Sequence, residues 1–109
     1  MATIDKDILL RLGATIAARK GADAGASYVA GLLASGEDAI LRKVLEEAAE
    51  TLLASKEGDK LHLVRETADL WFHSLVLLAW HGVGPQEVLD ELQRREGVSG
   101  VTEKASRKK

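Results

Sequence analysis

Residues 70–80 constrain the fold more than any other segment, because they are apolar except for His73 and Ser74. A helix through this segment carries apolar side chains on every side, and such a helix is normally buried. The chain has only 109 residues, the size of one domain, so four shorter helices can hardly enclose it. We therefore expect two copies of the chain to pack these helices together in a homodimer.

The composition predicts an all-α fold of about five helices. Pro85 is the only proline, and β-branched and aromatic residues are sparse, so helix-favouring residues dominate. The expected helices cover about residues 4–20, 28–35, 37–56, 60–81 and 85–96. We expect Thr3, Ser27 and Asp59 to be N-caps. The side chains of such residues accept hydrogen bonds from the backbone amides of the first helical turn.

Charge and cysteine usage exclude several classes of protein. We expect one domain over residues 1–97 and a basic tail over residues 98–109. The net charge of -2 argues against a nucleic-acid binder. No cysteine is present, which excludes disulfides, thiolate catalysis and cysteine zinc sites. The sequence shows no signal core and no apolar run of membrane-spanning length, so a cytoplasmic location is expected.

Two of the expected helices carry acidic pairs with a spacing of three. Glu47 and Glu50 lie in the third helix, and Glu66 and Asp69 lie in the fourth. Residues three apart are neighbours on one helix face, and Glu46 falls on the same face as the first pair. The opposite face of the third helix carries the apolar stripe Leu41, Leu45, Ala48 and Leu52.

A single acidic face is most often only solvated, but two features favour a bound cation here. No lysine or arginine follows Glu46, Glu47, Glu50 or Glu66 by four residues, so their repulsion is not compensated within the helix. Glu66 and Asp69 also begin the most apolar helix, where an unpaired carboxylate is costly. Mg²⁺ takes oxygen ligands, so we expect it on Glu47, Glu50, Glu66 and Asp69.

Other metals fit this pattern less well. Di-iron bundles need Glu-x-x-His on two helices, which this chain does not supply. His62 and His73 share a face with Glu66 and Asp69, so a mixed site for a transition metal stays open. A histidine at such a position more often supports a ligand, and His73 is expected to support Asp69. The chemistry that remains is metal-assisted hydrolysis of a phosphate anhydride.

The spacing of these acids resembles the signature of the all-α MazG-like NTP pyrophosphohydrolases. Within that group, the chain is similar to the phosphoribosyl-ATP pyrophosphatase family over about residues 8–107. The similar segments are residues 27–28, 36–38, 43–44, 46–48, 68–70, 73, 76–79, 94–95, 99–100, 103–105 and 107. Two residues depart from the family pattern. Leu45 replaces a glycine, which we expect to change packing, and Ala39 replaces a common basic residue, which we expect to remove one phosphate contact.

The resemblance implies a MazG-like helical bundle that hydrolyses phosphoribosyl-ATP to phosphoribosyl-AMP and pyrophosphate, the second step of histidine biosynthesis, with Mg²⁺. Glu46 then accepts the proton of the attacking water or holds another ion. Lys43 either contacts the phosphates or pairs with Glu47. Lys104 and Arg107 either fold over the triphosphate or belong to a frayed terminus.

Two other functions fit the same residues. One is a house-cleaning pyrophosphohydrolase that acts on non-standard nucleoside triphosphates and differs from the first hypothesis only in its substrate. The other is a non-enzymatic helical dimerisation module, whose acids form ion pairs with the basic residues of a partner.

Overall fold

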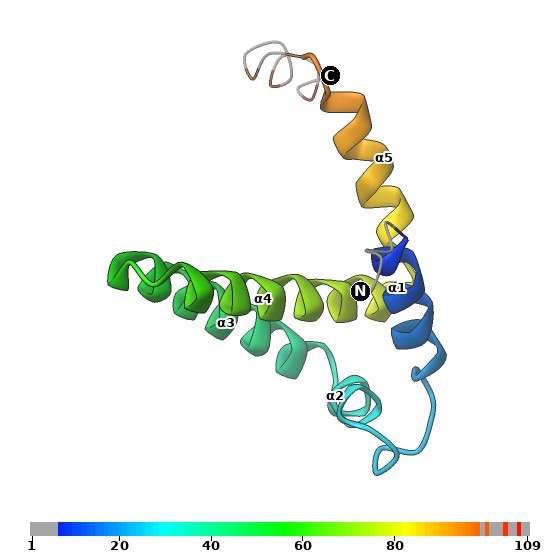
Figure 1. The fold of residues 1–109 in the computed structure, drawn as a ribbon. Helices are drawn as coiled ribbons and strands as arrows, with labels where there is room; N and C mark the ends of the chain where they lie inside the picture. Colours follow the sequence, from blue (N-terminus) through cyan, green and yellow to red (C-terminus); the bar gives the residue numbers. More distant parts are fainter. Residues whose placement is uncertain (1–6, 99, 101–103, 105–106, 108–109) are drawn as a thin grey trace, which may run out of the picture.

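The computed structural model describes residues 7–98 together with residues 100, 104 and 107. Within these residues the chain forms five helices and no strand, so the all-α prediction is confirmed (Figure 1). The helices are α1 (Ile8–Ala18), α2 (Tyr28–Ser35), α3 (Glu37–Glu57), α4 (Lys60–Trp80) and α5 (Pro85–Arg95). In this part of the chain no helix has the length and apolar character needed to cross a membrane.

The predicted helix ends are correct except in the first helix. Ser27 accepts a hydrogen bond from the amide of Ala30, and Asp59 accepts hydrogen bonds from the first turn of α4, as expected of N-caps. α1 ends two residues earlier than predicted, because its last turn tightens, with the amide of Arg19 bonding the carbonyl three residues earlier; in the described residues it begins at Ile8, and residues 4–6 of the prediction lie outside them. The predicted cap Thr3 lies outside the described residues.

α3 and α4 form a long antiparallel hairpin (Figure 1). Gly58 ends α3 in a left-handed conformation with φ of 78°, which a residue with a side chain rarely adopts. Asp59 follows at once and caps α4 through the amides of Leu61 and His62. This two-residue connection sets the register in which residues of α3 face residues of α4.

The hydrophobic core lies at one end of the hairpin. Ile16, Ile40 and Val76 are fully buried, and they come from α1, from the start of α3 and from the second half of α4. Leu32, Leu33, Leu75 and Ala79 complete the buried cluster. α1 and α2 therefore cover only the part of the hairpin that contains the carboxyl end of α4, and the rest of the hairpin extends beyond them (Figure 1).

α4 is not enclosed by the single chain, as its apolar composition and the small number of other helices predict. Phe72 and Trp80 pack against the core, but Trp71 is 58% exposed. The apolar stripe of α3 is also open to solvent, with Leu45 71% exposed. The reason is that α1 and α2 reach only one end of the hairpin. A large apolar surface therefore remains on α3 and α4, and such surfaces usually mark an interface.

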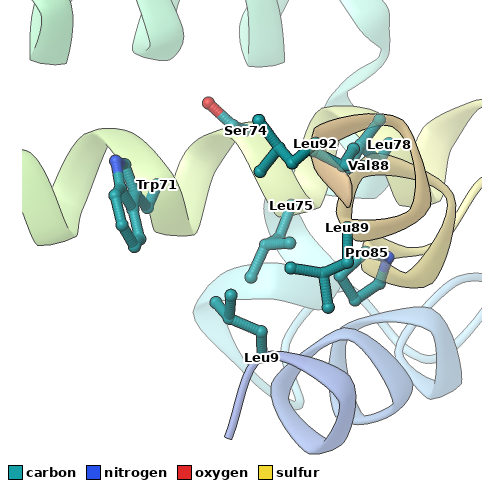
Figure 2. A pocket seen from close by; sticks show the side chains of 9 residues that line it. All are labelled: Leu9, Trp71, Ser74, Leu75, Leu78, Pro85, Val88, Leu89 and Leu92. Carbon is teal, nitrogen blue, oxygen red and sulfur yellow. The ribbon is translucent and has the colours of Figure 1, made fainter. Parts of the chain in front are cut away.

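An apolar groove runs between α4 and α5, with α1 at one end (Figure 2). Its lining residues are Leu9, Trp71, Ser74, Leu75, Leu78, Pro85, Val88, Leu89 and Leu92. α5 points away from the hairpin, so it contributes one wall and leaves the groove open (Figure 1). This groove extends the apolar surface of the hairpin toward α5.

Close packing of α1 against α5 depends on a glycine. A Cβ atom built on Gly13 would lie 2.5 Å from Cδ and 2.6 Å from Cγ of Pro85, closer than real Cβ atoms approach other atoms. Pro85 is the first residue of α5, and the side chain of Glu87 accepts a hydrogen bond from the amide of Gly84 just before it. Gly13 thus sets where α5 begins relative to α1.

Gly13→Ala is expected to destabilise the protein by about 1–3 kcal/mol, the usual cost of overpacking. Helix propensity alone would change stability in the opposite direction, because alanine favours a helix by about 0.5–1 kcal/mol over glycine. Chemical denaturation gives the free energy of unfolding. Gly25→Ala is the matched control, since nothing lies within 4 Å of its Cβ position. A Gly13→Ala variant more stable than the wild type would contradict the contact with Pro85.

Candidate active site

Three carboxylates from the two helices of the hairpin converge between them. Glu47 comes from α3, and Glu66 and Asp69 come from α4. One oxygen from each lies within 4.8 Å of the others. Glu47 is buried at 6% exposure, Glu66 is partly buried and Asp69 is exposed, so the cluster opens to solvent on the side of Asp69. This acidic cluster contains three of the four predicted metal ligands.

Two oxygens of the acidic cluster are buried without a hydrogen-bond partner. They are Oε2 of Glu47 and Oε2 of Glu66. An unsatisfied buried carboxylate oxygen costs free energy, because it has lost water and gained nothing in exchange. A hard divalent cation bound by these oxygens would remove that cost, and a set of carboxylate ligands is what such a cation prefers. The residues present therefore fit a divalent metal.

Glu50, the fourth predicted ligand, is exposed beside Glu66. The pKa of Glu50 is raised, chiefly because its carboxyl shares a hydrogen bond with Glu66 and is repelled by the charge of that residue. Glu50 therefore interacts electrostatically with the acidic cluster through Glu66.

Lys43 is the basic residue of α3 that contacts the acidic cluster. Its Nζ lies 3.4 Å from Oε2 of Glu46 and 3.5 Å from Oε1 of Glu47. The ion pair, one of the two roles considered for Lys43, is thus present. Burial lowers the pKa of Lys43, but its interactions with Tyr28, Glu46 and Glu47 raise it more, so the net pKa lies above its ordinary value. Glu46 is half-exposed, with its carboxylate held toward Lys43.

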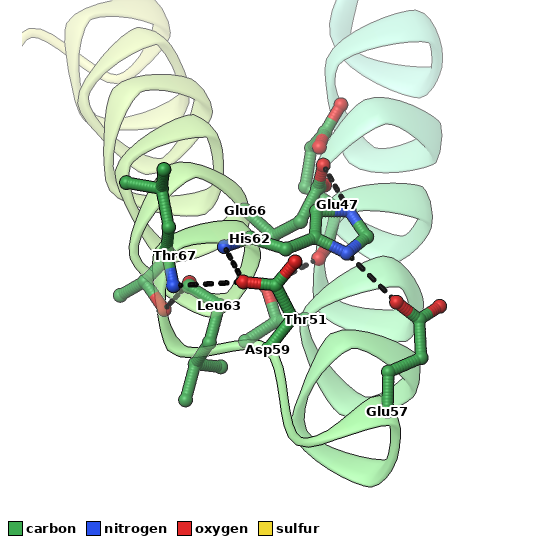
Figure 3. A network of polar contacts seen from close by, with 9 residues as sticks. Glu47, Thr51, Glu57, Asp59, His62, Leu63, Glu66 and Thr67 are labelled. Atoms are coloured by element: carbon green, nitrogen blue, oxygen red, sulfur yellow. Dashed lines mark hydrogen bonds and ion pairs between the residues drawn. The ribbon is translucent and has the colours of Figure 1, made fainter.

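His62 contacts the cluster from α4 (Figure 3). Its Nε2 lies 3.4 Å from Oε1 of Glu66, and its Nδ1 lies 3.0 Å from Oε2 of Glu57. The hydrogen bond to Glu57 is the main reason that the pKa of His62 is raised. Lys43 and His62 therefore each contact one acidic side chain of the cluster through its Oε1 atom. The Oε2 atoms of Glu47 and Glu66 stay without a hydrogen-bond partner.

His73 is buried, and both of its ring nitrogens have partners in the protein. Nδ1 lies 2.8 Å from the backbone oxygen of Asp69, and Nε2 lies 2.8 Å from the hydroxyl of Tyr28. His73 thus contacts the backbone of Asp69 and leaves its carboxylate untouched. With both nitrogens occupied, His73 offers no lone pair to a metal, which disfavours the mixed histidine site. Tyr28 had no predicted role, because nothing in the sequence links residues 45 positions apart.

In the described residues, no contact joins Lys104 to the acidic cluster. Lys104 and Arg107 are both exposed and follow α5, which points away from the hairpin (Figure 1). The two departures from the family pattern also lie apart from the cluster. Ala39 packs against the hydrophobic core, and Leu45 faces solvent in the single chain. The packing change expected at Leu45 and the weaker phosphate binding expected from Ala39 stay predictions.

Comparison with known proteins gives one consistent result. Residues 9–96 match the family described as phosphoribosyl-ATP pyrophosphohydrolase. A protein of Nitrosospira multiformis named phosphoribosyl-ATP pyrophosphatase is 66% identical over 104 residues, which cover 95% of this chain and 86% of that protein. A protein of Chromobacterium violaceum with the same name is 63% identical over 102 residues, 94% of each chain. A third, from Neisseria gonorrhoeae, is 56% identical over 100 residues, 92% of this chain and 94% of its own.

These matches span the acidic pairs of both helices and all five helices of the fold. The family inferred from the resemblance of the acid spacing and the further sequence segments is thereby confirmed, and with it the assignment of the protein as a hydrolase. The chain belongs to the phosphoribosyl-ATP pyrophosphohydrolase family.

Proposed function

We propose that the acidic cluster binds Mg²⁺ and is the site at which this protein hydrolyses phosphoribosyl-ATP to phosphoribosyl-AMP and pyrophosphate. The reaction and its place in histidine biosynthesis follow from membership of the family. The observation that carries the site is the pair of buried oxygens without partners, Oε2 of Glu47 and Oε2 of Glu66. A triphosphate substrate is itself polyanionic, so a site of bare carboxylates would repel it without a cation.

Glu47, Glu66 and Asp69 would hold the Mg²⁺, and Glu50, whose pKa is raised by Glu66, would join them as a fourth ligand. A bound Mg²⁺ supplies charge neutralisation for the phosphates and lowers the pKa of a nearby water. The site is open on the side of the exposed Asp69, so a substrate with charged phosphates can approach there.

Glu46 is our candidate for the general base. It is half-exposed next to the buried Glu47, and it can accept a proton from the attacking water. Lys43 holds Glu46 in place through the 3.4 Å ion pair and brings a positive charge toward the phosphates. Lys104 and Arg107, in a tail over residues 98–109 that follows a domain of residues 1–97, are proposed to contact the triphosphate once it is bound.

Glu47→Gln combined with Glu66→Gln is expected to weaken Mg²⁺ binding at least about 100-fold. Substitution of a residue that only supports a metal ligand can weaken metal binding by about that factor, and this variant changes two of the ligands themselves. Turnover should be lost with it. The metal-free variant should stay folded and melt at the same or a higher temperature, because buried carboxylates without partners are removed. Isothermal titration calorimetry and thermal melting measure the two effects.

The matched control is Asp38→Asn with Glu96→Gln, which removes two exposed charges at the start of α3 and just after α5. It should bind Mg²⁺ as the wild type does. If the Glu47/Glu66 variant keeps its Mg²⁺ affinity, the proposed metal site is wrong. If that variant loses only the binding of a protein partner, the acids belong to an interaction module.

Pyrophosphate release identifies the substrate. We expect turnover of phosphoribosyl-ATP that requires Mg²⁺ and stops when the metal is chelated, with little release from a panel of ordinary and modified nucleoside triphosphates. A preference for the panel would favour the house-cleaning alternative. Absence of any turnover from folded protein would contradict both enzymatic hypotheses.

We also propose that the working unit is a homodimer. The apolar surface left open on the hairpin includes Leu45 and Trp71, and the groove beside α5 continues it (Figure 2). Apolar area of this kind contributes about 25 cal/mol per Å² when it is covered. A second copy carries the same surface, so a two-fold arrangement would cover both at once.

Trp71→Glu is expected to shift the protein from dimer to monomer, because a charge on the open face of α4 is costly to bury. Analytical ultracentrifugation at several concentrations reports the mass. Ala34→Glu places the same charge on an exposed position of α2 and should leave the dimer intact. A wild-type protein that sediments as a monomer at all concentrations would overturn the proposal.

A cytoplasmic location is part of the same proposal. The family acts on a derivative of ATP in a biosynthetic pathway, and both are typical of the cytoplasm. Cell fractionation with an antibody against the protein tests it, and recovery in the membrane or secreted fraction would contradict it.

A further inference from the structure

We propose that Tyr28 is a positioning residue, whose hydroxyl acts through His73 to hold the turn of α4 that carries Asp69. This inference rests on the proposed metal site. It assigns a role in that site to α2, a helix that contributes no carboxylate to the acidic cluster.

The hydrogen bonds of His73 fix which of its nitrogens carries the proton. The backbone oxygen of Asp69 can only accept, so Nδ1 of His73 must be the donor in the 2.8 Å contact. In a neutral imidazole Nε2 is then the acceptor, so the hydroxyl of Tyr28 donates to it over 2.8 Å. The chain of bonds therefore runs in one direction, from Tyr28 through His73 to Asp69.

The ring of His73 is also held by its aromatic neighbours. Tyr28 meets it edge to face at a centroid distance of 5.8 Å, and Phe72 does so at 5.4 Å. Phe72 packs against the hydrophobic core. His73 is thus fixed on one side by the core and on the other by Tyr28, which makes it a rigid link between α2 and α4.

Asp69 needs such support more than the other two members of the acidic cluster. Glu47 is held by Lys43, and Glu66 is held by His62. Among the described residues, no hydrogen bond or ion pair restrains the carboxylate of Asp69. The direction of the Asp69 carboxylate therefore depends on the backbone of the helical turn that carries it. His73 donates a hydrogen bond to the backbone oxygen of Asp69 in that turn.

Core packing does not account for Tyr28, because its side chain lies largely open. Tyr28 is 57% exposed although its hydroxyl is engaged. Tyr28 also lies near enough to Lys43 of α3 to contribute to the raised pKa of that lysine. Tyr28 therefore lies within electrostatic reach of both helices that form the metal site.

Tyr28→Phe tests the inference, since it keeps the ring and removes only the hydroxyl. We expect the affinity of the substrate-free protein for Mg²⁺, measured by calorimetry, to fall about tenfold, as it does when a group behind a metal ligand is removed. The value of kcat should fall by a similar factor at saturating Mg²⁺, while KM for phosphoribosyl-ATP changes less than about twofold.

Ser35→Ala is the matched control on the same helix. It removes a hydroxyl that bonds only within α2, to the carbonyl of Gly31 at 2.8 Å. Its Mg²⁺ affinity and kcat should equal those of the wild type. Nitrogen NMR of the His73 ring adds a spectroscopic readout, and it should show the proton on Nδ1 in the wild type.

Three results would overturn the inference. Tyr28→Phe would bind Mg²⁺ as tightly as the wild type, or it would lose affinity only together with its fold, or the NMR spectrum would place the His73 proton on Nε2. These differ from a failure of the proposed function. In that case the wild type itself would bind no Mg²⁺, and the Glu47/Glu66 variant would behave like it.

Discussion

The close approach of three carboxylates between α3 and α4 is the interaction on which the rest of the structure depends. Glu47 of α3 is buried and Glu66 of α4 is partly buried, and each has one oxygen without a hydrogen-bond partner. Isolated helices would separate to hydrate these groups, but the Gly58 turn and the Asp59 cap keep them facing each other. The hairpin thus holds these acidic side chains close together, and we propose that a divalent cation compensates their repulsion, as expected where polyphosphate is bound and cleaved.

Much of this site could be predicted because its determinants are local. Acids three residues apart on a helix share a face, and caps such as Ser27 and Asp59 act on the next turn, so sequence spacing is enough to find them. Contacts between distant segments leave no such pattern. The fit of Gly13 against Pro85 and the bond from Tyr28 to His73 emerge only when the helices are placed in space.

Apolar periodicity predicts which face of a helix is buried, but it does not predict whether the same chain or a second copy buries that face. The stripe through Leu45 and the all-round apolar character of α4 both indicated burial, yet Leu45 and Trp71 are exposed in the single chain. The core is complete only where α1 and α2 meet the hairpin. The open apolar surface and the acidic cluster lie on the same two helices, α3 and α4.

Anomalous diffraction from crystals grown with Mn²⁺ tests the central claim most directly, because Mn²⁺ takes the same oxygen ligands as Mg²⁺ and can be located without ambiguity. The account predicts an anomalous peak between Glu47, Glu66 and Asp69, about 2.0–2.2 Å from their oxygens. Crystals saturated with Mn²⁺ that show no peak there, from protein that is fully active, would contradict it.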